Sequence, residues 1–426
     1  MKLLLKNADI ITVNNKKEVL KNTNIGIEND LIKFIGEVPK DFEPNNIIDC
    51  KGKVVMPGLC NSHTHVSMSL LRNYANDLPL FQWLSEKIWP IEDKFNENHV
   101  YWGSMLSIAE MIKSGTTSFS DMYFFMEEVA KAVDETGVRG VLSRGMMGES
   151  AKGDQRFDEL RSLYKNYNGA ANGRITVMAG PHAPYTCSDE YLKSVMDIAS
   201  ELNVPIHIHL SESRGEVEES IKKYGKSPIE HMEELGLFKF KTLAAHCVHL
   251  SDNDINILKS NNVSVANNPG SNLKLGNGFA PVKKLLDKGV NVALGTDGAS
   301  SNNNQNMFEE MNLASIINKA VCEDTTVVPA IKAIEMGTVN GALAMNLNNV
   351  GAVEAGKKAD LIVVDFNKPH LYPNLDMVSS IVYSAQGSDV SHVIVNGKVL
   401  MDNYELKTID IEKVIYNVEK ITKDLY

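Results

Sequence analysis

The sequence has few cysteines and no long apolar run. Its 426 residues include five cysteines, with no C-x-x-C pair among them: Cys50, Cys60, Cys187, Cys247 and Cys322. An odd, scattered set fits neither a disulfide framework nor a zinc finger, so we expect free thiols in a reducing compartment. No stretch approaches the roughly 18 apolar residues of a membrane-spanning helix, and Lys6 and Asp9 interrupt the N-terminal apolar stretch before it reaches the length of a signal-peptide core. We therefore expect a cytoplasmic protein with no membrane partner.

An excess of positive charge is also missing. The chain has 43 Lys and Arg residues against 54 Asp and Glu residues, a formal net charge of -11. This charge repels nucleic-acid phosphates, so we expect no nucleic-acid partner. Apolar residues (43%) and charged residues (23%) are close to ordinary globular usage, which provides a full core. At roughly 150 residues per domain, the length indicates two or three domains, or one large α/β barrel with an accessory unit.

Strand and helix patterns alternate through the middle of the chain. Eight short β-branched runs end in polar residues, at 54–65, 116–122, 138–145, 175–184, 205–213, 242–250, 263–269 and 290–298. Helical segments lie between them, several with Asp, Ser or Pro at cap positions, including 126–137, 189–203, 251–261 and 281–289. Alternation predicts a parallel sheet, and eight repeats predict its closure into a (β/α)₈ TIM-type barrel of the α/β class.

The two ends of the chain have a different pattern. The segments NIGIENDLIKFIG and SHVIVNGKVLMDN alternate as strands do, include turn residues such as Asn-Gly, and leave no room for βαβ units. We therefore predict a small β-sandwich built from both termini, residues 1–53 and 346–426, the latter ending in a helix. The barrel, residues 54–345, is inserted between them.

Two histidines end the first run, VVMPGLCNSHTH. Residues i and i+2 of a strand face the same way, so His63 and His65 project from one side. That geometry suits two ligands of one metal. For H-x-H alone, a hydrogen-bonded pair near a turn is an equal alternative.

The fifth run, PIHIHLSES, contains two more histidines and a carboxylate. Spacing alone does not choose between His207 and His209 as a metal ligand. Active sites of such barrels lie at the carboxyl ends of the strands, which favours His209 and leaves His207 as support in the core. Glu212, three residues beyond His209, suits a proton shuttle.

The sixth run contains His246 and the eighth contains Asp297. Each residue in isolation is more typical of a cap or turn. The four strand ends meet only if the barrel forms, and they then make one site. Imidazoles with one carboxylate and no thiolate suit Zn²⁺ or Fe²⁺ with a position open to water.

The motifs PGLCNSHTH, HIHLSES, AAHCVHL and GTDGASSNNN, with the terminal strands ADLIVVD and VIVNGK, resemble the amidohydrolase superfamily. Within its mononuclear deaminase branch, the sequence is most similar to the 5-methylthioadenosine/S-adenosylhomocysteine deaminases, over nearly the whole chain. The resemblance implies one divalent metal per chain, Zn²⁺ first with Fe²⁺ or Mn²⁺ as alternatives, held by His63, His65, His209 and Asp297. It also implies a nucleoside substrate that is hydrolysed to its inosyl product and ammonia.

The resemblance further implies roles for individual side chains. The catalytic residues are Glu212, His246 and Asp297, which transfer protons and orient the water. The substrate contacts are Trp83, Glu92, Arg144, Arg156, His182, Glu212 and Asp297. Glu92 is expected at the ribose hydroxyls, Arg144 near the 5′ substituent, and Arg156 at a homocysteine carboxylate.

Several of these residues have plainer explanations. Trp83 could pack on a helix, as Trp89 is expected to do; Glu92 could be a solvated helix carboxylate and Arg144 a surface cation. The fourth run has no lysine to bridge two metals, so a binuclear site is not expected. Two alternative functions remain: a deaminase or dechlorinase of guanine, cytosine or an s-triazine, and a catalytically inactive scaffold of the same fold. The sequence also leaves open whether the chain forms a homo-oligomer.

Overall fold

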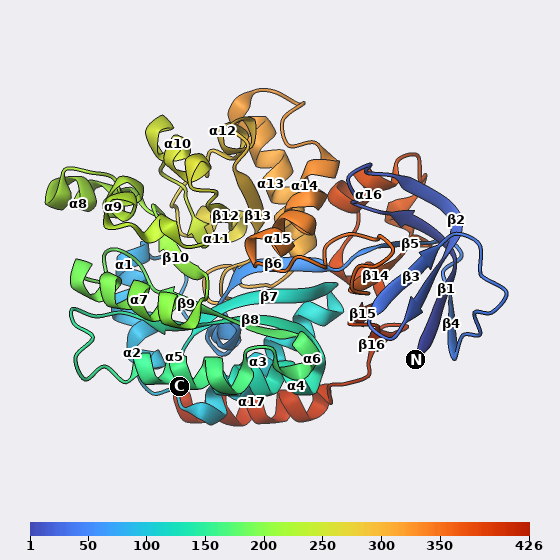
Figure 1. The fold of residues 1–426 in the computed structure, drawn as a ribbon, viewed down its shortest axis with the longest axis horizontal. Helices are drawn as coiled ribbons and strands as arrows, with labels where there is room; N and C mark the ends of the chain where they lie inside the picture. Colours follow the sequence, from blue (N-terminus) through green and yellow to red (C-terminus); the bar gives the residue numbers. More distant parts are fainter.

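The computed structural model describes residues 1–426. A parallel β-barrel fills the centre of the molecule (Figure 1). Eight strands follow one another around a single sheet, each parallel to the next. They are β6 (Leu59–Thr64), β7 (Thr116–Tyr123), β8 (Arg139–Met146), β9 (Ile175–Pro181), β10 (Ile206–Leu210), β11 (Thr242–His246), β12 (Ser264–Asn267) and β13 (Asn291–Leu294). The predicted fold class is confirmed.

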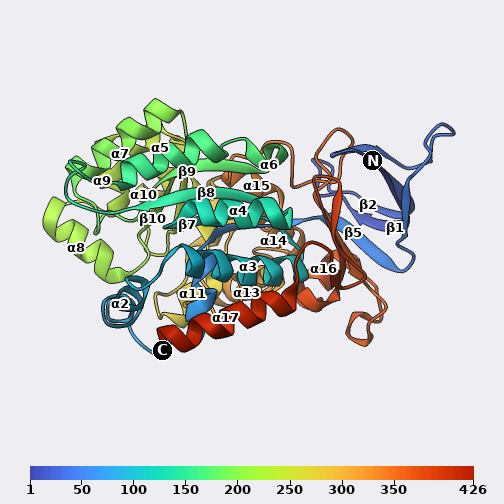
Figure 2. The same cartoon turned by 90° about the horizontal axis from the view of Figure 1, so that it is seen from below.

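Helices pack around the outside of this barrel (Figures 1 and 2). The larger ones are α3 (Glu97–Lys113), α4 (Met126–Thr136), α5 (Arg156–Tyr167), α7 (Asp189–Leu202), α8 (Arg214–Tyr224), α9 (Pro228–Leu235), α10 (Asp252–Ser260), α12 (Val282–Asp287), α13 (Met307–Cys322), α14 (Ala330–Met336) and α15 (Val339–Ala344). The cap residues expected from the sequence do start helices. The Ser188 side chain accepts a hydrogen bond from the amide of Tyr191 at the start of α7, and Ser251 forms a capping box with Asp254 at the start of α10.

The barrel closes between its first and last strands without a regular ladder. The Asp297 amide donates to the carbonyl of His63 at 2.9 Å, and the Thr296 amide donates to Asn61 Oδ1 at 3.0 Å. A Cβ atom on Gly295 would lie 2.7 and 2.8 Å from the carbonyl oxygen and amide nitrogen of His63, so only glycine allows this approach. The closure therefore brings residues 295–297 against the strand end that carries His63.

The first predicted run is two strands, so the expectation of one strand over 54–65 is wrong. β5 (Lys53–Pro57) pairs with β1 (Lys2–Ile11) and β14 (Leu361–Asp365), whereas β6 pairs with β7. The change of sheet occurs at Gly58, where a Cβ atom would lie 2.1 Å from Thr117 Oγ1. The domain division at 53/54 and 345/346 stays a prediction.

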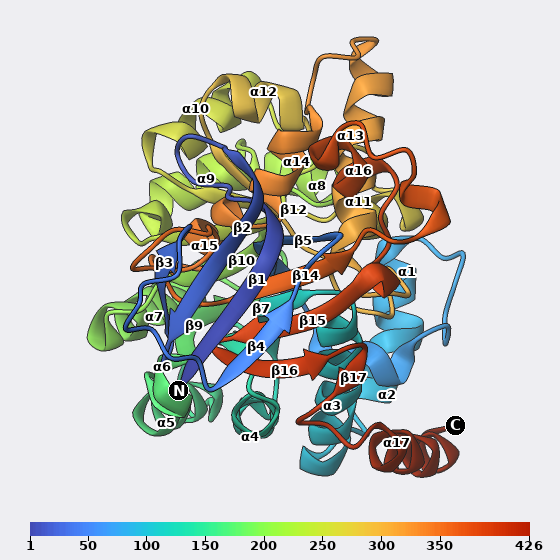
Figure 3. The ribbon, with the colours of Figure 1, turned by 90° about the vertical axis from the view of Figure 1, so that its right-hand side faces the viewer.

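The remaining strands form one mixed sheet beside the barrel (Figure 3), in the order β17, β16, β15, β14, β5, β1, β2, β3, with β4 also paired to β1. The strands not yet given are β2 (Val19–Glu28), β3 (Leu31–Ile35), β4 (Asn46–Asp49), β15 (Val390–Val395), β16 (Lys398–Asp402) and β17 (Glu405–Leu406). Fifteen buried apolar residues from both termini make its core. The composite β unit is thus confirmed.

Two further helices come from the C-terminal part. α16 (Met377–Tyr383) packs on α14, and α17 (Ile411–Leu425) runs along α3 (Figure 2). None of the helices is both long and apolar enough to span a bilayer.

Candidate active site

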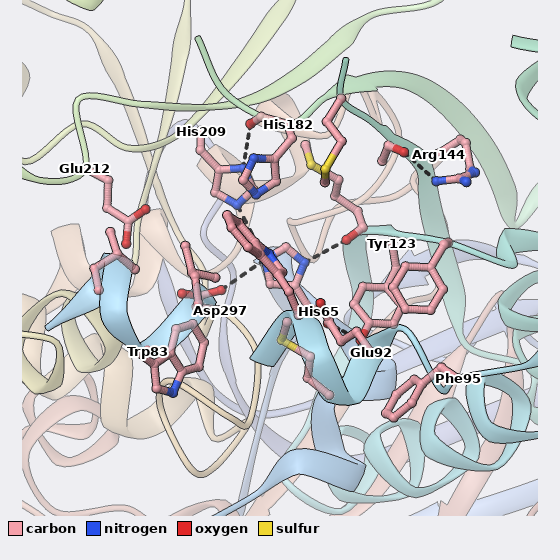
Figure 4. Close-up of a pocket in the computed structure, with 18 of the residues that line it drawn as sticks. His65, Trp83, Glu92, Phe95, Tyr123, Arg144, His182, His209, Glu212 and Asp297 are labelled. Atoms are coloured by element: carbon pink, nitrogen blue, oxygen red, sulfur yellow. Dashed lines mark hydrogen bonds and ion pairs between the residues drawn. The ribbon is translucent and has the colours of Figure 1, made fainter. Parts of the chain in front are cut away.

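Imidazoles and a carboxylate meet at the carboxyl ends of the barrel strands (Figure 4). His63 and His65 come from β6 and its end, His209 from β10, His246 from β11, and Asp297 from the segment after β13. The Asp297 Oδ1 atom lies 3.5 Å from His63 Nε2 and 3.3 Å from His65 Nε2. The Nε2 atoms of His65 and His209 are 3.4 Å apart.

The arrangement of these atoms fits a metal ion. The Nε2 atom of His63 is buried and has no hydrogen-bond partner. The second ring nitrogens of two other histidines are occupied: His65 Nδ1 donates to the Met122 carbonyl at 2.7 Å, and His209 Nδ1 to the His182 carbonyl at 2.8 Å. Such bonds fix the ring orientation and direct Nε2 toward a metal. Two sets have ligand atoms within 4.8 Å of one another: His63, His65 and Asp297, and His63, His209 and His246.

The electrostatics keep these candidate ligands in the protonation states that bind a metal ion. Burial lowers the pKa of His63 to about 4 and also lowers the pKa of His65 and His209. Burial opposes ionisation of Asp297, but its contacts with the neighbouring imidazoles hold its pKa well below its usual range. Neutral imidazoles and an ionised carboxylate are the forms that bind a divalent cation.

His207 lies behind the cluster. Its Nε2 atom is 2.9 Å from His63 Nδ1, and its Nδ1 atom lies 3.3 Å from Ser120 Oγ and 3.4 Å from Ser143 Oγ. His207 therefore contacts the far side of the His63 ring, whereas His209 faces the cluster.

Glu212 and His246 lie next to each other at the edge of the cluster. Glu212 Oε2 is 3.7 Å from His246 Nε2, and its Oε1 atom accepts from Asn277 Nδ2 at 2.9 Å. Burial raises the pKa of Glu212. Burial disfavours the His246 cation, but the nearby carboxylates of Glu212 and Asp297 raise its pKa. The pair is equipped to hold and exchange protons.

Sequence reasoning missed Glu216. Its carboxylate accepts the backbone amides of Ser211 and Glu212 at 2.9 and 2.8 Å, across a turn in which Ser211 has a φ of +52°. A carboxylate in the first turn of α8, whose cap is Ser213, was the available signal. Glu216 fixes the backbone that carries Glu212.

The hydroxyl groups around Asp297 were missed as well. Ser271 Oγ and Ser301 Oγ donate to its Oδ2 atom at 2.6 and 3.0 Å. The Gly298 amide donates to Oδ1 at 2.8 Å. Ser301 and Gly298 were visible in GTDGASSNNN, but no pattern there assigns them to a carboxylate oxygen.

A cavity of about 650 Å³ opens over the cluster. The predicted site residues that line it are His65, Trp83, Glu92, Arg144, Arg156, His182, His209, Glu212, His246 and Asp297. The remaining predicted ligand, His63, is completely buried beneath them. Thirteen of the 25 lining residues are hydrophobic, so the cavity suits a flat, partly apolar molecule.

One wall comes from the segment between residues 80 and 92. It contains α1 (Leu80–Trp83), a π-helical turn (Leu84–Ile88) and α2 (Trp89–Glu92). The Trp83 indole lines the cavity and donates from Nε1 to the Ala75 carbonyl at 3.2 Å. Trp89 packs against the hydrophobic core, as expected, and lines the cavity as well.

Glu92 is not an ordinary solvated carboxylate. It accepts a hydrogen bond from the hydroxyl of Tyr123, a cavity residue that sequence reasoning missed although it directly follows the second predicted strand. Burial raises the pKa of Glu92 to about 7, despite the opposing effect of the Tyr123 hydroxyl.

The opposite wall holds the two predicted arginines. Arg144 donates to the carboxylate of Glu159 and to the Gly145 carbonyl. Arg156 donates to the Met147 carbonyl, and its Nη1 atom lies 3.2 Å from Asp154 Oδ2.

His182 directly follows β9, the fourth barrel strand, and lies beside His209. Its Nδ1 atom lies 2.9 Å from Thr186 Oγ1, and burial lowers its pKa to about 3. His182 is therefore a neutral hydrogen-bonding group in the cavity.

Residues 54–400 match the model of the amidohydrolase family. The chain belongs to this family. The predicted resemblance is confirmed by a 5-methylthioadenosine/S-adenosylhomocysteine deaminase of Thermoanaerobacter pseudethanolicus, 54% identical over 100% of this chain and 99% of the relative.

Solved structures of the same fold include other hydrolases. This amidohydrolase superimposes on an adenosine deaminase from Xanthomonas campestris with bound zinc, at a TM-score of 0.94 and 32% identity over 99% of this chain and 98% of the other. It shares its fold with an atrazine chlorohydrolase from Arthrobacter aurescens complexed with zinc, with a TM-score of 0.92 and 22% identity over 99% and 100% of the two chains.

Proposed function

We propose that the protein is a metal-dependent hydrolase that deaminates adenine nucleosides, with 5-methylthioadenosine and S-adenosylhomocysteine as substrates. The observation that carries the proposal is the Glu212–His246 pair beside the ligand cluster, at the floor of a cavity whose walls hold Glu92 and Arg144. The name of the 54% identical relative supports the substrate class.

The ligands proposed for one divalent metal are His63, His65, His209 and Asp297. Zinc is the proposed ion because the similar adenosine deaminase structure contains it. A divalent ion in such a site supplies Lewis-acid chemistry that lowers the pKa of a water molecule toward neutrality.

The residues of the chain move the protons. Glu212, whose pKa is raised, holds a proton and donates it to ring nitrogen N1, which makes C6 more electrophilic. His246 takes one proton as the water oxygen adds to C6. His246 then gives this proton to the amino group, which leaves as ammonia, and Glu212 recovers its proton from the C6 hydroxyl as the carbonyl forms.

The cavity walls bind the remainder of the nucleoside. Glu92 accepts hydrogen bonds from the ribose hydroxyls, Trp83 packs beside the nucleoside, and His182 hydrogen-bonds to it. Arg144 and Arg156 face the 5′ substituent, with the carboxylate of a homocysteine chain as their partner. A free base or a triazine would leave these ribose and carboxylate contacts unused.

The test is ammonia release with parallel metal analysis. The panel is 5-methylthioadenosine, S-adenosylhomocysteine, adenosine, 5′-deoxyadenosine, guanine, cytosine and an aminotriazine. We expect turnover of the adenine nucleosides only, with one metal per chain. Turnover of only a free base or triazine would overturn the substrate assignment, and no turnover after addition of Zn²⁺, Fe²⁺ or Mn²⁺ would favour the inactive scaffold.

A further inference from the structure

The proposed function, on which this inference rests, sets the direction of a bound nucleoside. With C6 at the ligand cluster and N1 toward Glu212, the ribose and its 5′ substituent extend away from Glu212. Figure 4 shows Arg144 and Glu212 on opposite sides of the His65 and His209 rings, with Tyr123 and Glu92 on the same side as Arg144. The 5′ substituent therefore reaches the wall that holds Arg144.

Arg144 is already paired there with a carboxylate that also lines the cavity. Its Nε atom donates to Glu159 Oε2, and its Nη1 atom donates to the Gly145 carbonyl. The Nη2 atom of Arg144 and the Oε1 atom of Glu159 have no hydrogen-bond partner in the protein. The Arg144 side chain is 12% exposed and that of Glu159 is 48% exposed. The guanidinium group is therefore mostly buried, whereas the carboxylate is accessible to a ligand.

The neighbouring pair of Arg156 and Asp154 is different. Both carboxylate oxygens of Asp154 are used: Oδ1 accepts the Arg156 amide at 3.0 Å, and Oδ2 accepts the Tyr191 hydroxyl at 2.6 Å. Asp154 does not line the cavity, whereas Glu159 does. Glu159 is thus the paired carboxylate that still has an oxygen to offer a ligand.

We propose that Arg144 and Glu159 together bind an α-amino-acid zwitterion at the 5′ end of the substrate. The free guanidinium nitrogen of Arg144 donates to the ligand carboxylate, and the free oxygen of Glu159 accepts from the ligand ammonium group. The existing ion pair stays intact, and each ligand charge meets its opposite. Glu159 is then a specificity-determining residue for the homocysteinyl group, because a methylthio group has no charge for it to bind.

The experiment compares ligands that differ only in the ammonium group. These are S-adenosylhomocysteine and 5′-S-(3-carboxypropyl)-5′-thioadenosine, with 5-methylthioadenosine as the uncharged reference. kcat/KM is measured for the wild type, Glu159→Gln, and Asp158→Asn. Asp158 is the matched control because it lies on the same helix, carries the same charge, and is 86% exposed beside Arg161.

We expect the wild type to prefer S-adenosylhomocysteine over the carboxypropyl compound. Glu159→Gln should reduce that preference by about three- to tenfold, the usual effect of a partly exposed charged hydrogen bond, and Asp158→Asn should leave it unchanged. An unchanged preference in Glu159→Gln would overturn the inference. A larger preference would also overturn it, because Glu159 would then compete with the substrate carboxylate for Arg144.

Another free carboxylate lines the cavity and provides a second check. Asp93 follows Glu92 and is exposed. Loss of the ammonium preference in Asp93→Asn, with the preference kept in Glu159→Gln, would assign the contact to Asp93 and reject Glu159. If the wild type turns over none of the three compounds, the proposed function itself fails and this inference fails with it.

Discussion

The Glu212→Gln substitution tests the proposed proton transfer without changing metal binding or folding. The Gln side chain has the same shape, and its carbonyl oxygen can keep the 2.9 Å hydrogen bond from Asn277. What the variant loses is the carboxyl group to which the proposed mechanism assigns proton donation to N1, and whose pKa burial raises. General acid-base catalysis contributes about 10²- to 10⁴-fold, which corresponds to about 2.7 to 5.4 kcal/mol of transition-state stabilisation.

The assay is ammonia release from 5-methylthioadenosine, with metal content and Tm measured on the same preparation. We expect kcat to fall at least about 100-fold, while metal content stays unchanged and Tm moves by about 2 °C or less. Glu219→Gln is the matched control, because Glu219 lies on the exposed face of nearby α8 and has no partner there. A Glu212→Gln variant with full metal and more than a tenth of wild-type kcat would refute the assignment of Glu212 as the proton donor.

Three further predictions concern the ligands, the ribose contact and the barrel closure. His63→Ala should lose both bound metal and turnover, and full metal occupancy by elemental analysis would show that the ligand set is wrong. For Glu92, whose pKa burial raises to about 7, the ionised form accepts both ribose hydroxyls, so KM for adenosine should fall as pH rises through about 7. KM for 2′,3′-dideoxyadenosine should not change in this way, and a flat adenosine profile would contradict the contact. Gly295→Ala should lower stability by about 1–3 kcal/mol and weaken metal affinity, because its Cβ would lie 2.7 Å from the His63 carbonyl. Gly215→Ala, where the nearest atom is 3.5 Å away, is the control, and equal metal affinity and equal Tm in the two variants would contradict this reasoning.

The sequence predicted the barrel because period-2 runs and turn residues are local signals. The same locality explains the error at 54–65, where the apolar pattern continues unbroken through Gly58 while the pairing partner changes from β1 to β7. The place of Trp89 in the cavity lining was not predicted for a similar reason, since no pattern within α2 tells which of its side chains line a cavity. Motifs at the strand ends identified the candidate ligands because the required residue types are unusual there.

The backbone conformation at the strand ends, which orients the candidate site residues, could not be predicted from the sequence. Ser211, His246 and Asp297 all have left-handed backbone, with φ values of +52°, +73° and +63°, although none is glycine. Such a conformation costs about 1–3 kcal/mol per residue and persists only where surrounding structure holds it. Glycine would remove the cost, but at His246 and Asp297 it would also remove the side chain that faces the cavity.

Contacts between strand ends hold these turns in place. The Cys247 amide donates to the Leu210 carbonyl at 3.0 Å, the Val248 amide donates to the Ser211 carbonyl at 3.0 Å, and the Asp297 amide donates to the His63 carbonyl at 2.9 Å. The first two bonds join the ends of the neighbouring strands β10 and β11, and the third joins the two ends of the sheet, which only barrel closure brings together. The strained turns and the barrel therefore depend on each other: the closed barrel supplies the hydrogen bonds, and the left-handed residues direct His246 and Asp297 toward the cluster. A sequence pattern covers one strand end at a time, so it predicts which residues end the strands and misses the bonds by which one strand end orients the next.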